Sequence, residues 1–196
     1  MVLAEFFPGG HPRNLLWTIV RPWLVFGHVD LVGRARSFAA DAYGSEQALQ
    51  HPDAVAALVR DAGADEEVQA AAYLHDLVED TDVELPQIAA EFGSRVTCLV
   101  AAMTEDESIP DYVERKEEHR RRARGSGRDV ALLFVADKLS NARRMRRGLK
   151  QPDAGKFGHY AATLETMRAA YPDLPLLDEL DAELHALRGE LQRSPA

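Results

Sequence analysis

Three short stretches of this chain combine side chains that bind metal ions with side chains that transfer protons. They contain His75-Asp76 followed by Glu79-Asp80, then Asp137 followed by Asn141, and an upstream His51-Pro52 pair. Imidazole and carboxylate groups without thiolate suit Mn²⁺, Fe²⁺ or Zn²⁺. These residue types therefore predict a site for a divalent metal, with further carboxylates close enough to act on water.

The surroundings of the candidate ligands predict that they are buried. Asp137 follows residues 131–136, which are apolar on every side of a helix. His75 and Asp76 likewise follow the apolar residues 70–74. A lone carboxylate in such a place is costly unless it is paired or bound to a metal. We therefore expect these side chains to meet at one buried site from separate helices.

Helical spacing suggests how the roles are divided. His75 and Glu79 are four residues apart, as are Asp76 and Asp80, so a continuous helix over 70–80 would place them in two adjacent rows. In that arrangement His75 and Asp76 would hold the metal. Glu79 and Asp80, one turn further along, would then face water or substrate.

The elements that position these residues are expected to be helices. Apolar residues recur at helical spacing along most of the chain, and strand alternation is missing over any useful length. Start and stop signals predict an all-α domain of about nine or ten helices. The expected helices include residues 29–43, 52–62, 65–80, 82–93, 94–103, 129–147, 155–170 and 176–191.

The two longer motifs together resemble those of the HD phosphohydrolase superfamily. They read His-Asp-x-x-Glu-Asp-Thr at 75–81 and Ala-Asp-Lys-Leu-x-Asn at 136–141. Their wording is most similar to the hydrolase domain of the RelA/SpoT family, which removes the 3′-pyrophosphate from (p)ppGpp. The resemblance implies an HD-domain helical bundle. We expect its core over 29–170, an N-terminal arm and helix over 1–28, and a C-terminal helix over 171–196 packed on the same domain.

The resemblance also implies roles for single residues. Matched motif by motif, the metal ligands fall on His51, His75, Asp76 and Asp137, and the water-activating pair falls on Glu79 and Asp80. The amide of Asn141 would lie against the sugar and phosphates of a nucleotide. Arg143 and Arg144, together with Arg115 and Arg147, are candidates to neutralise phosphate charge. We expect one divalent ion, Mn²⁺ first, with Fe²⁺ and Zn²⁺ as alternatives.

The segment before His51 departs from the RelA/SpoT pattern. The family carries a basic element there that clamps the purine base, whereas residues 37–59 contain no Lys or Arg. The sequence therefore predicts a metal-dependent phosphohydrolase of a nucleotide or similar phosphorylated metabolite. (p)ppGpp is the leading substrate, and another nucleotide is the alternative. A hypothesis from another class is a non-catalytic HD domain that senses a nucleotide or metal, or serves as an interaction module.

Charge distribution bears on the partners. The net charge is −9, yet residues 115–150 hold 13 Lys/Arg against 4 Asp/Glu. The mostly acidic remainder would repel nucleic acid, so we expect a small phosphorylated anion as the partner. Residues 120–122, three arginines, have the alternative interpretation of a solvated helix face. Whether the chain forms a homo-oligomer stays open.

Remaining features predict a cytoplasmic protein without a membrane partner. No secretory signal is evident, and the apolar stretch 15–26 is divided by Arg21-Pro22 into halves too short to span a bilayer. The single cysteine, Cys98, lies in an apolar run and is expected in the core. His119, His159 and His185 match no motif, and we expect them to be ordinary packing or surface residues.

Overall fold

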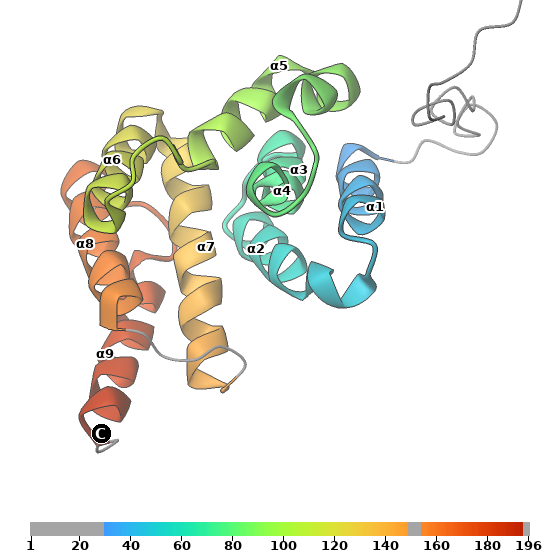
Figure 1. Ribbon diagram of the computed structural model, residues 1–196. Helices are drawn as coiled ribbons and strands as arrows, with labels where there is room; N and C mark the ends of the chain where they lie inside the picture. Colours follow the sequence, from blue (N-terminus) through green and yellow to red (C-terminus); the bar gives the residue numbers. More distant parts are fainter. Residues whose placement is uncertain (1–29, 149–153, 194–196) are drawn as a thin grey trace, which may run out of the picture.

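The computed structural model describes residues 30–148 and 154–193, and every regular element in these ranges is helical (Figure 1). The elements are α1 (Leu31–Tyr43), the 3₁₀ helix η2 (Glu46–Leu49), α2 (Gln50–Asp61), α3 (Glu66–Leu74), α4 (Leu77–Asp80), α5 (Leu85–Met103), α6 (Tyr112–Gly125), α7 (Arg128–Arg146), α8 (Ala154–Ala170) and α9 (Leu177–Arg193). Nine α-helices over the described ranges confirm the all-α prediction.

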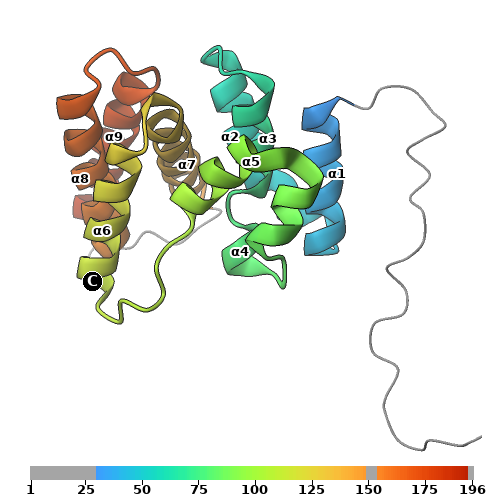
Figure 2. The same cartoon turned by 90° about the horizontal axis from the view of Figure 1, so that it is seen from above.

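Helix α7 lies at the centre of this arrangement. It contacts α2, α3 and α5 on one side and α6, α8 and α9 on the other. Figures 1 and 2 show α1–α5 on one side of α7 and α6, α8 and α9 on the opposite side. The reason lies in the sequence: residues 130–136 of α7 are all apolar and all buried, so the helix needs partners around its whole circumference.

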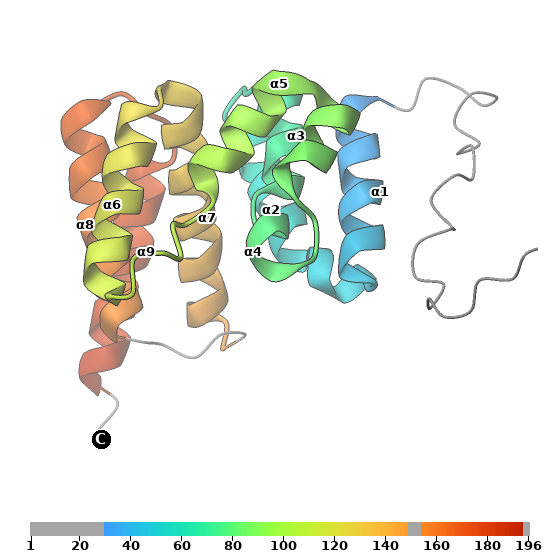
Figure 3. The ribbon, with the colours of Figure 1, turned by 45° about the horizontal axis from the view of Figure 1, so that its top comes forward.

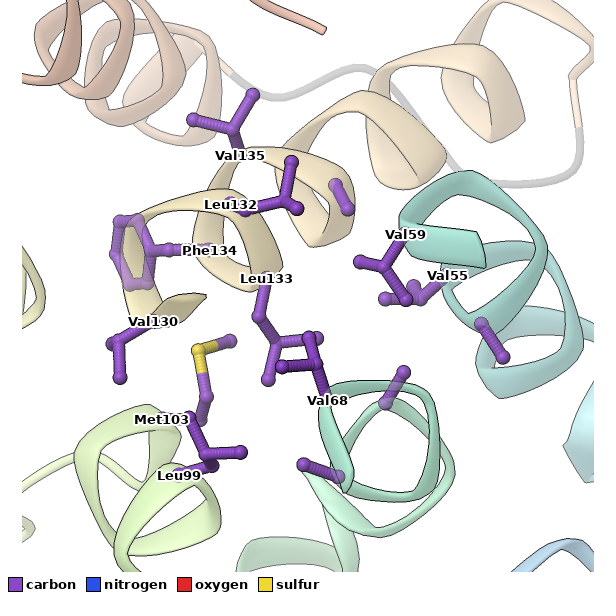
Figure 4. Close-up of a cluster of buried hydrophobic side chains, with 14 of the residues drawn as sticks. Val55, Val59, Val68, Leu99, Met103, Val130, Leu132, Leu133, Phe134 and Val135 are labelled. Atoms are coloured by element: carbon purple, nitrogen blue, oxygen red, sulfur yellow. The ribbon is translucent and has the colours of Figure 1, made fainter. Parts of the chain in front are cut away.

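The core beside α7 is built from aliphatic side chains of four helices (Figure 4). Leu133 of α7 meets Val68 of α3, with Val59 of α2 and Met103 of α5 on either side. Leu133 and Val68 are fully buried. Replacing a buried leucine by alanine lowers the free energy of unfolding by about 2–5 kcal/mol, because the surrounding structure fills the resulting cavity only in part. Packing of this kind holds α2, α3 and α7 in one position relative to each other, and the candidate ligands lie on α2, on α7 and directly after α3.

Predicted helix ends appear at the expected residues. Gly44, with φ 67°, ends α1, and its backbone N–H donates to the Ala40 carbonyl at 3.0 Å. Asp65 begins α3 by accepting from the backbone N–H of Val68 at 3.1 Å. Gly93, with φ 82°, interrupts α5 as a kink and the helix then resumes. The predicted break at Gly93 therefore separates two helical segments, as expected for residues 82–103.

The predicted continuous helix over 70–80 is wrong. Helix α3 ends at Leu74, and α4 starts at Leu77, so His75 and Asp76 lie in a turn between them. The His75 ring contributes to this break, because its Nδ1 lies 2.8 Å from the Ala72 carbonyl. That carbonyl would otherwise accept from the Asp76 backbone amide in a regular helix. Figure 3 shows α3 and α4 between α1 and α7.

The prediction for Cys98 is also wrong. Helix α5 buries Val96, Leu99 and Val100, whereas Cys98 is exposed on another face of the same helix. An apolar run of residues does not bury every member of an amphipathic helix, because only one stripe faces the core.

Two predictions about the ends of the chain have different outcomes. The predicted arm and helix over 1–28 lie outside the described residues. Helix α9 packs against α7 and α8, on the side of α7 away from α2. The division into 29–170 and 171–196 stays a prediction. Among the described helices none has the length and apolarity that crossing a bilayer requires.

Candidate active site

Four of the predicted residues meet where α2, the α3–α4 turn and α7 approach each other, and we call them the ligand cluster: His51, His75, Asp76 and Asp137. Asp137 Oδ1 lies 3.1 Å from His51 Nε2 and 4.0 Å from His75 Nε2. The Asp76 carboxylate places one oxygen 3.1 Å from His75 Nε2 and the other 3.6 Å from His51 Nε2. Side chains far apart in sequence thus converge on one point.

Hydrogen bonds behind the two imidazoles orient them. His75 Nδ1 lies 2.8 Å from the Ala72 carbonyl, which can only accept, so Nδ1 carries the hydrogen. His51 Nδ1 lies 2.9 Å from Ser140 Oγ. With its hydrogen on Nδ1, His51 also turns the lone pair of Nε2 toward the carboxylates. The Ala72 carbonyl fixes this tautomer at His75, whereas Ser140 Oγ can donate or accept and therefore orients the His51 ring without fixing its tautomer.

Charge in the cluster favours a cation between the rings. Burial lowers the pKa of His75, but Asp76 and Asp137 more than offset this and raise it to about 9. Burial raises the pKa of the Asp137 carboxyl, yet Lys138, His51 and His75 hold it well below its usual range. Asp137 is therefore ionised even though it is buried: Lys138 pairs with one carboxylate oxygen, and the other oxygen faces the imidazoles.

These residues fit a divalent metal. His51, His75 and Asp137 each offer one ligand atom, and the three atoms lie within 4.8 Å of one another. Asp76 lies beside both imidazoles, although it is not part of this group of three. The Nε2 atoms of His51 and His75 are buried without a hydrogen-bond partner in the described part of the chain. Nitrogen and oxygen atoms that converge in this way match the ligands of first-row divalent ions, which displace the proton from an imidazole when they bind.

The predicted water-activating carboxylates lie at the edge of the cluster on α4. Glu79 accepts a hydrogen bond from the Glu105 backbone N–H at 2.7 Å. Burial, followed by the charges of Asp76 and Glu105, raises the pKa of Glu79 to about 7 despite that hydrogen bond. A carboxylate with this pKa can accept a proton near neutral pH. Asp80 lines the same cavity as Glu79.

A cavity of ≈ 580 Å³ opens over the cluster. Its lining comes from helices on both sides of α7 and comprises Tyr43, Gln47, Ala48, His51, Pro52, Asp76, Glu79, Asp80, Glu105, Tyr112, Lys116, Asp137, Lys138, Asn141, Arg144, Lys156, His159 and Tyr160. This size suits a small-molecule ligand. We call Lys116, Arg144 and Lys156, on α6, α7 and α8, the cationic wall.

The structure places some of the predicted substrate-binding residues at the cavity and others away from it. Asn141 lines the cavity, and its Nδ2 donates to Asp137 Oδ1 at 2.6 Å. Arg144 also lines the cavity, whereas Arg143 forms ion pairs with Glu179 and Glu183 of α9. Arg115 and Arg147 are not among the lining residues. The structure therefore brings one of the four candidate arginines to the cavity.

Sequence reasoning missed several residues of the cavity. Lys116 and Lys156 belong to no motif, and only the local excess of positive charge over 115–150 pointed toward Lys116. Glu105, after α5, accepts from Arg115 Nε at 3.1 Å and also pairs with Lys116. His159 was expected to be an ordinary residue, yet it lines the cavity.

Comparison with known proteins agrees with this geometry. Residues 32–158, more than half of the chain, match the HD domain family. A probable guanosine-3′,5′-bis(diphosphate) 3′-pyrophosphohydrolase of Synechocystis is 37% identical over 124 residues, which are 58% of this chain and 16% of that protein. The mouse enzyme of this name, MESH1, is 41% identical over 101 residues, or 50% of this chain and 56% of its own length.

A solved structure extends the likeness to three dimensions. It is described as a metazoan ortholog of SpoT that hydrolyses ppGpp, and it aligns with a TM-score of 0.67 at 26% identity. The alignment covers 84% of this chain and 98% of that one. The chain therefore belongs to the HD domain family. It spans 16% and 56% of the two curated relatives described above.

Proposed function

We propose that this protein is a metal-dependent phosphohydrolase that removes the 3′-pyrophosphate from (p)ppGpp or a closely similar nucleotide. The observation that carries the proposal is the ligand cluster beside Glu79, in one cavity with the cationic wall. The relatives named as guanosine-3′,5′-bis(diphosphate) 3′-pyrophosphohydrolases support the choice of substrate. The positive charges of the cationic wall favour a ligand with several negative charges over a neutral ligand.

The ligand cluster would hold one divalent ion, for which we propose Mn²⁺. His51 and His75 would contribute Nε2, and Asp76 and Asp137 would contribute carboxylate oxygens. When bound, the ion supplies Lewis-acid assistance to water and to a phosphoryl oxygen. Lys138, which is buried and paired with Asp137, keeps that carboxylate ionised and so ready to act as a ligand.

Glu79 would act as the general base. Its carboxylate would take a proton from the attacking water while the water oxygen forms a bond to phosphorus. The bond between phosphorus and the 3′-oxygen of the ribose then breaks with its electron pair on oxygen, and that oxygen leaves with the 5′-phosphorylated nucleoside and takes a proton from solvent water. The Glu105 backbone amide holds one oxygen of Glu79 at 2.7 Å, which leaves the other oxygen for this role. Asp80 would help to orient the water.

The cationic wall would bind the phosphate groups. Lys116, Arg144 and Lys156 place positive side chains on three helices around one cavity. Arg144 can donate two parallel hydrogen bonds to a phosphate, whereas the two lysines act as more compact charges. Asn141 would contact the sugar or a phosphate from the floor of the cavity.

A second substrate class is favoured by one specific observation. The side of the cavity formed by α1 and η2 contributes Tyr43, Gln47 and Ala48, and residues 37–59 contain no Lys or Arg. A guanine base would gain no charged partner there. Hydrolysis of another phosphorylated nucleotide at the same metal is therefore the alternative proposal.

We also propose a cytoplasmic location and a small nucleotide as the only ligand class, without nucleic-acid or membrane partners. The small nucleotide is supported by the relatives' names. A homo-oligomer is compatible with this proposal, and its size can be measured independently by light scattering.

The test is a phosphate- and pyrophosphate-release assay with Mn²⁺-loaded protein. Substrates are ppGpp, other nucleoside 3′-phosphates and 5′-di- and triphosphates, with elemental analysis on the same sample. We expect release of pyrophosphate from ppGpp or from one related nucleotide. A folded, metal-loaded protein that hydrolyses none of them overturns the proposal and favours the non-catalytic sensor.

A further inference from the structure

His159 on α8 has a place in the cavity that its sequence context did not indicate. Its side chain is 6% exposed, and it lines the cavity together with Lys116 and Lys138. The ring packs edge-on against Phe134 of α7, with centroids 6.1 Å apart and an interplanar angle of 85°. Packing thus fixes the position of the imidazole, as is typical of residues that belong to a preorganised site.

Arg120 determines which ring nitrogen of His159 carries the hydrogen. Arg120 Nη1 lies 2.8 Å from His159 Nδ1. A guanidinium group only donates, so Nδ1 must accept, and the hydrogen of the neutral ring must be on Nε2. Burial lowers the pKa of His159 to about 2, with Lys138, Lys116 and Arg120 acting in the same direction. The imidazole therefore stays neutral at physiological pH, with a single N–H donor.

That donor has no acceptor among the described residues. His159 Nε2 is buried and unpaired. An unsatisfied buried donor destabilises the folded state, and native proteins rarely keep one without a purpose. His119 also has unpaired ring nitrogens, but it is not among the cavity-lining residues, and its Nδ1 lies 3.8 Å from a Glu105 carboxylate oxygen. Among the residues that the structure describes, His159 is the one whose unpaired donor coincides with a wall of the cavity.

We propose that His159 Nε2–H donates to a phosphate or pyrophosphate oxygen of the bound ligand, and that Arg120 is the positioning residue that fixes this tautomer. The inference rests on the proposed function for the class of ligand. The ammonium groups of Lys116 and Lys138, which line the same cavity, attract the anion from any direction. A neutral N–H adds a directional hydrogen bond without adding another charge, so it selects one orientation of the phosphate group.

The binding test uses inorganic pyrophosphate as the probe, titrated calorimetrically into chelator-treated protein so that turnover plays no part. His159→Phe keeps a ring against Phe134 but removes the donor, and we expect at least about tenfold weaker binding. His159→Gln keeps an N–H donor and should bind within about threefold of wild type. His119→Gln is the matched buried control and should bind like wild type.

Equal affinity of wild type and His159→Phe overturns the inference, as does a wild type that does not bind pyrophosphate. A wild type that binds pyrophosphate but hydrolyses no nucleotide refutes the proposed function and leaves this inference standing. The two failures are therefore distinguishable.

A tautomer measurement remains informative if a His159 variant fails to fold. Long-range ¹⁵N–¹H correlation spectra of metal-free wild type should show His159 with hydrogen on Nε2. Arg120→Lys, which still donates, should keep that tautomer, and Arg120→Met should give a mixture. A hydrogen on Nδ1 in wild type, or an unchanged tautomer in Arg120→Met, contradicts the positioning role.

Discussion

The cavity has two walls that are held in different ways. The ligand cluster sits on α2, the α3–α4 turn and α7, and both of its imidazoles have hydrogen-bond partners behind them, the Ala72 carbonyl and Ser140. The cationic wall consists of longer, partly exposed side chains on α6, α7 and α8. The difference suggests that the reaction chemistry is preset in the fold, whereas ligand recognition depends on side chains that a few substitutions can change.

The strongest test of the ligand cluster is Asp137→Asn. The substitution keeps the shape of the side chain but removes the negative charge that faces His51 Nε2 and pairs with Lys138. We expect metal content to fall sharply and turnover to drop by about 10³-fold or more, since metal assistance contributes several kcal/mol. Elemental analysis and the release assay measure both. Asp129→Asn, an exposed acid on the same helix, should retain its metal; full metal content in Asp137→Asn would refute the cluster.

Glu79→Gln tests the chemistry without disturbing the metal. Loss of the general base should lower kcat by about 10³-fold, within the range known for acid–base catalysis. Metal content and nucleotide affinity should remain near wild type, as equilibrium binding would show. Glu107→Gln, in the exposed segment before α6, is the control. A nearly unchanged kcat in Glu79→Gln would assign the base to another group.

The pH profile sharpens the same assignment. Below its pKa Glu79 is protonated and cannot accept a proton, so activity should fall as the pH decreases. With the pKa of Glu79 raised to about 7 by burial, the midpoint of this acid limb lies near 7, or below it when a bound cation favours the ionised form. Values of kcat/KM measured from about pH 5 to 9 at saturating metal give this midpoint. A flat profile over this range contradicts the role of Glu79.

Ser140→Ala tests the partner behind one imidazole. Without Ser140 Oγ, His51 loses the hydrogen bond at Nδ1 that orients Nε2 toward Asp137. Metal affinity should weaken by about tenfold, the lower end of the effect of such supporting groups. Competition with a fluorescent chelator measures this affinity, and Ser126→Ala on the exposed end of α6 is the matched control. Equal affinities would mean that packing alone orients His51.

The smallest effect is expected at the cationic wall, where two neighbouring arginines provide a matched pair. Arg144→Gln should raise KM for the nucleotide about fivefold and leave kcat nearly unchanged, because a partly solvated charge contributes about 1 kcal/mol. Arg143→Gln should leave KM near wild type, since Arg143 pairs with Glu179 and Glu183 of α9. Steady-state kinetics of both variants decide this, and the reverse outcome would place Arg143 at the substrate.

The helices and the burial of Asp137 could be predicted because their signals are local, whereas the convergence of His51 with the other ligands was implied by the resemblance to the HD superfamily. Helical periodicity, glycine at helix ends and the apolar run before Asp137 each occupy a few consecutive residues. The break between α3 and α4 escaped this reasoning, because it involves a side chain competing with the backbone for the Ala72 carbonyl. Periodicity alone contains no information about that competition.

The cationic wall and His159 were harder to predict, because packing between helices that are distant in sequence brings them to the cavity. Lys116, Lys156 and His159 have no motif, and they reach the cavity only because α6 and α8 pack on the far side of α7 from α2. Arg143 and Arg144 are adjacent in sequence yet point to different neighbours, as consecutive residues on a helix do. Charge counting located the region but not the side chains.

The exposed thiol of Cys98 has a consequence for handling the protein. It is the single cysteine of the chain, it lies on the outer face of α5, and it is not among the residues that line the cavity. Two molecules can therefore crosslink through it in air without any loss of the chemistry in the cavity. Measuring the oligomeric state therefore requires a reductant or Cys98→Ser, and the same thiol provides a unique attachment point for a fluorescent label.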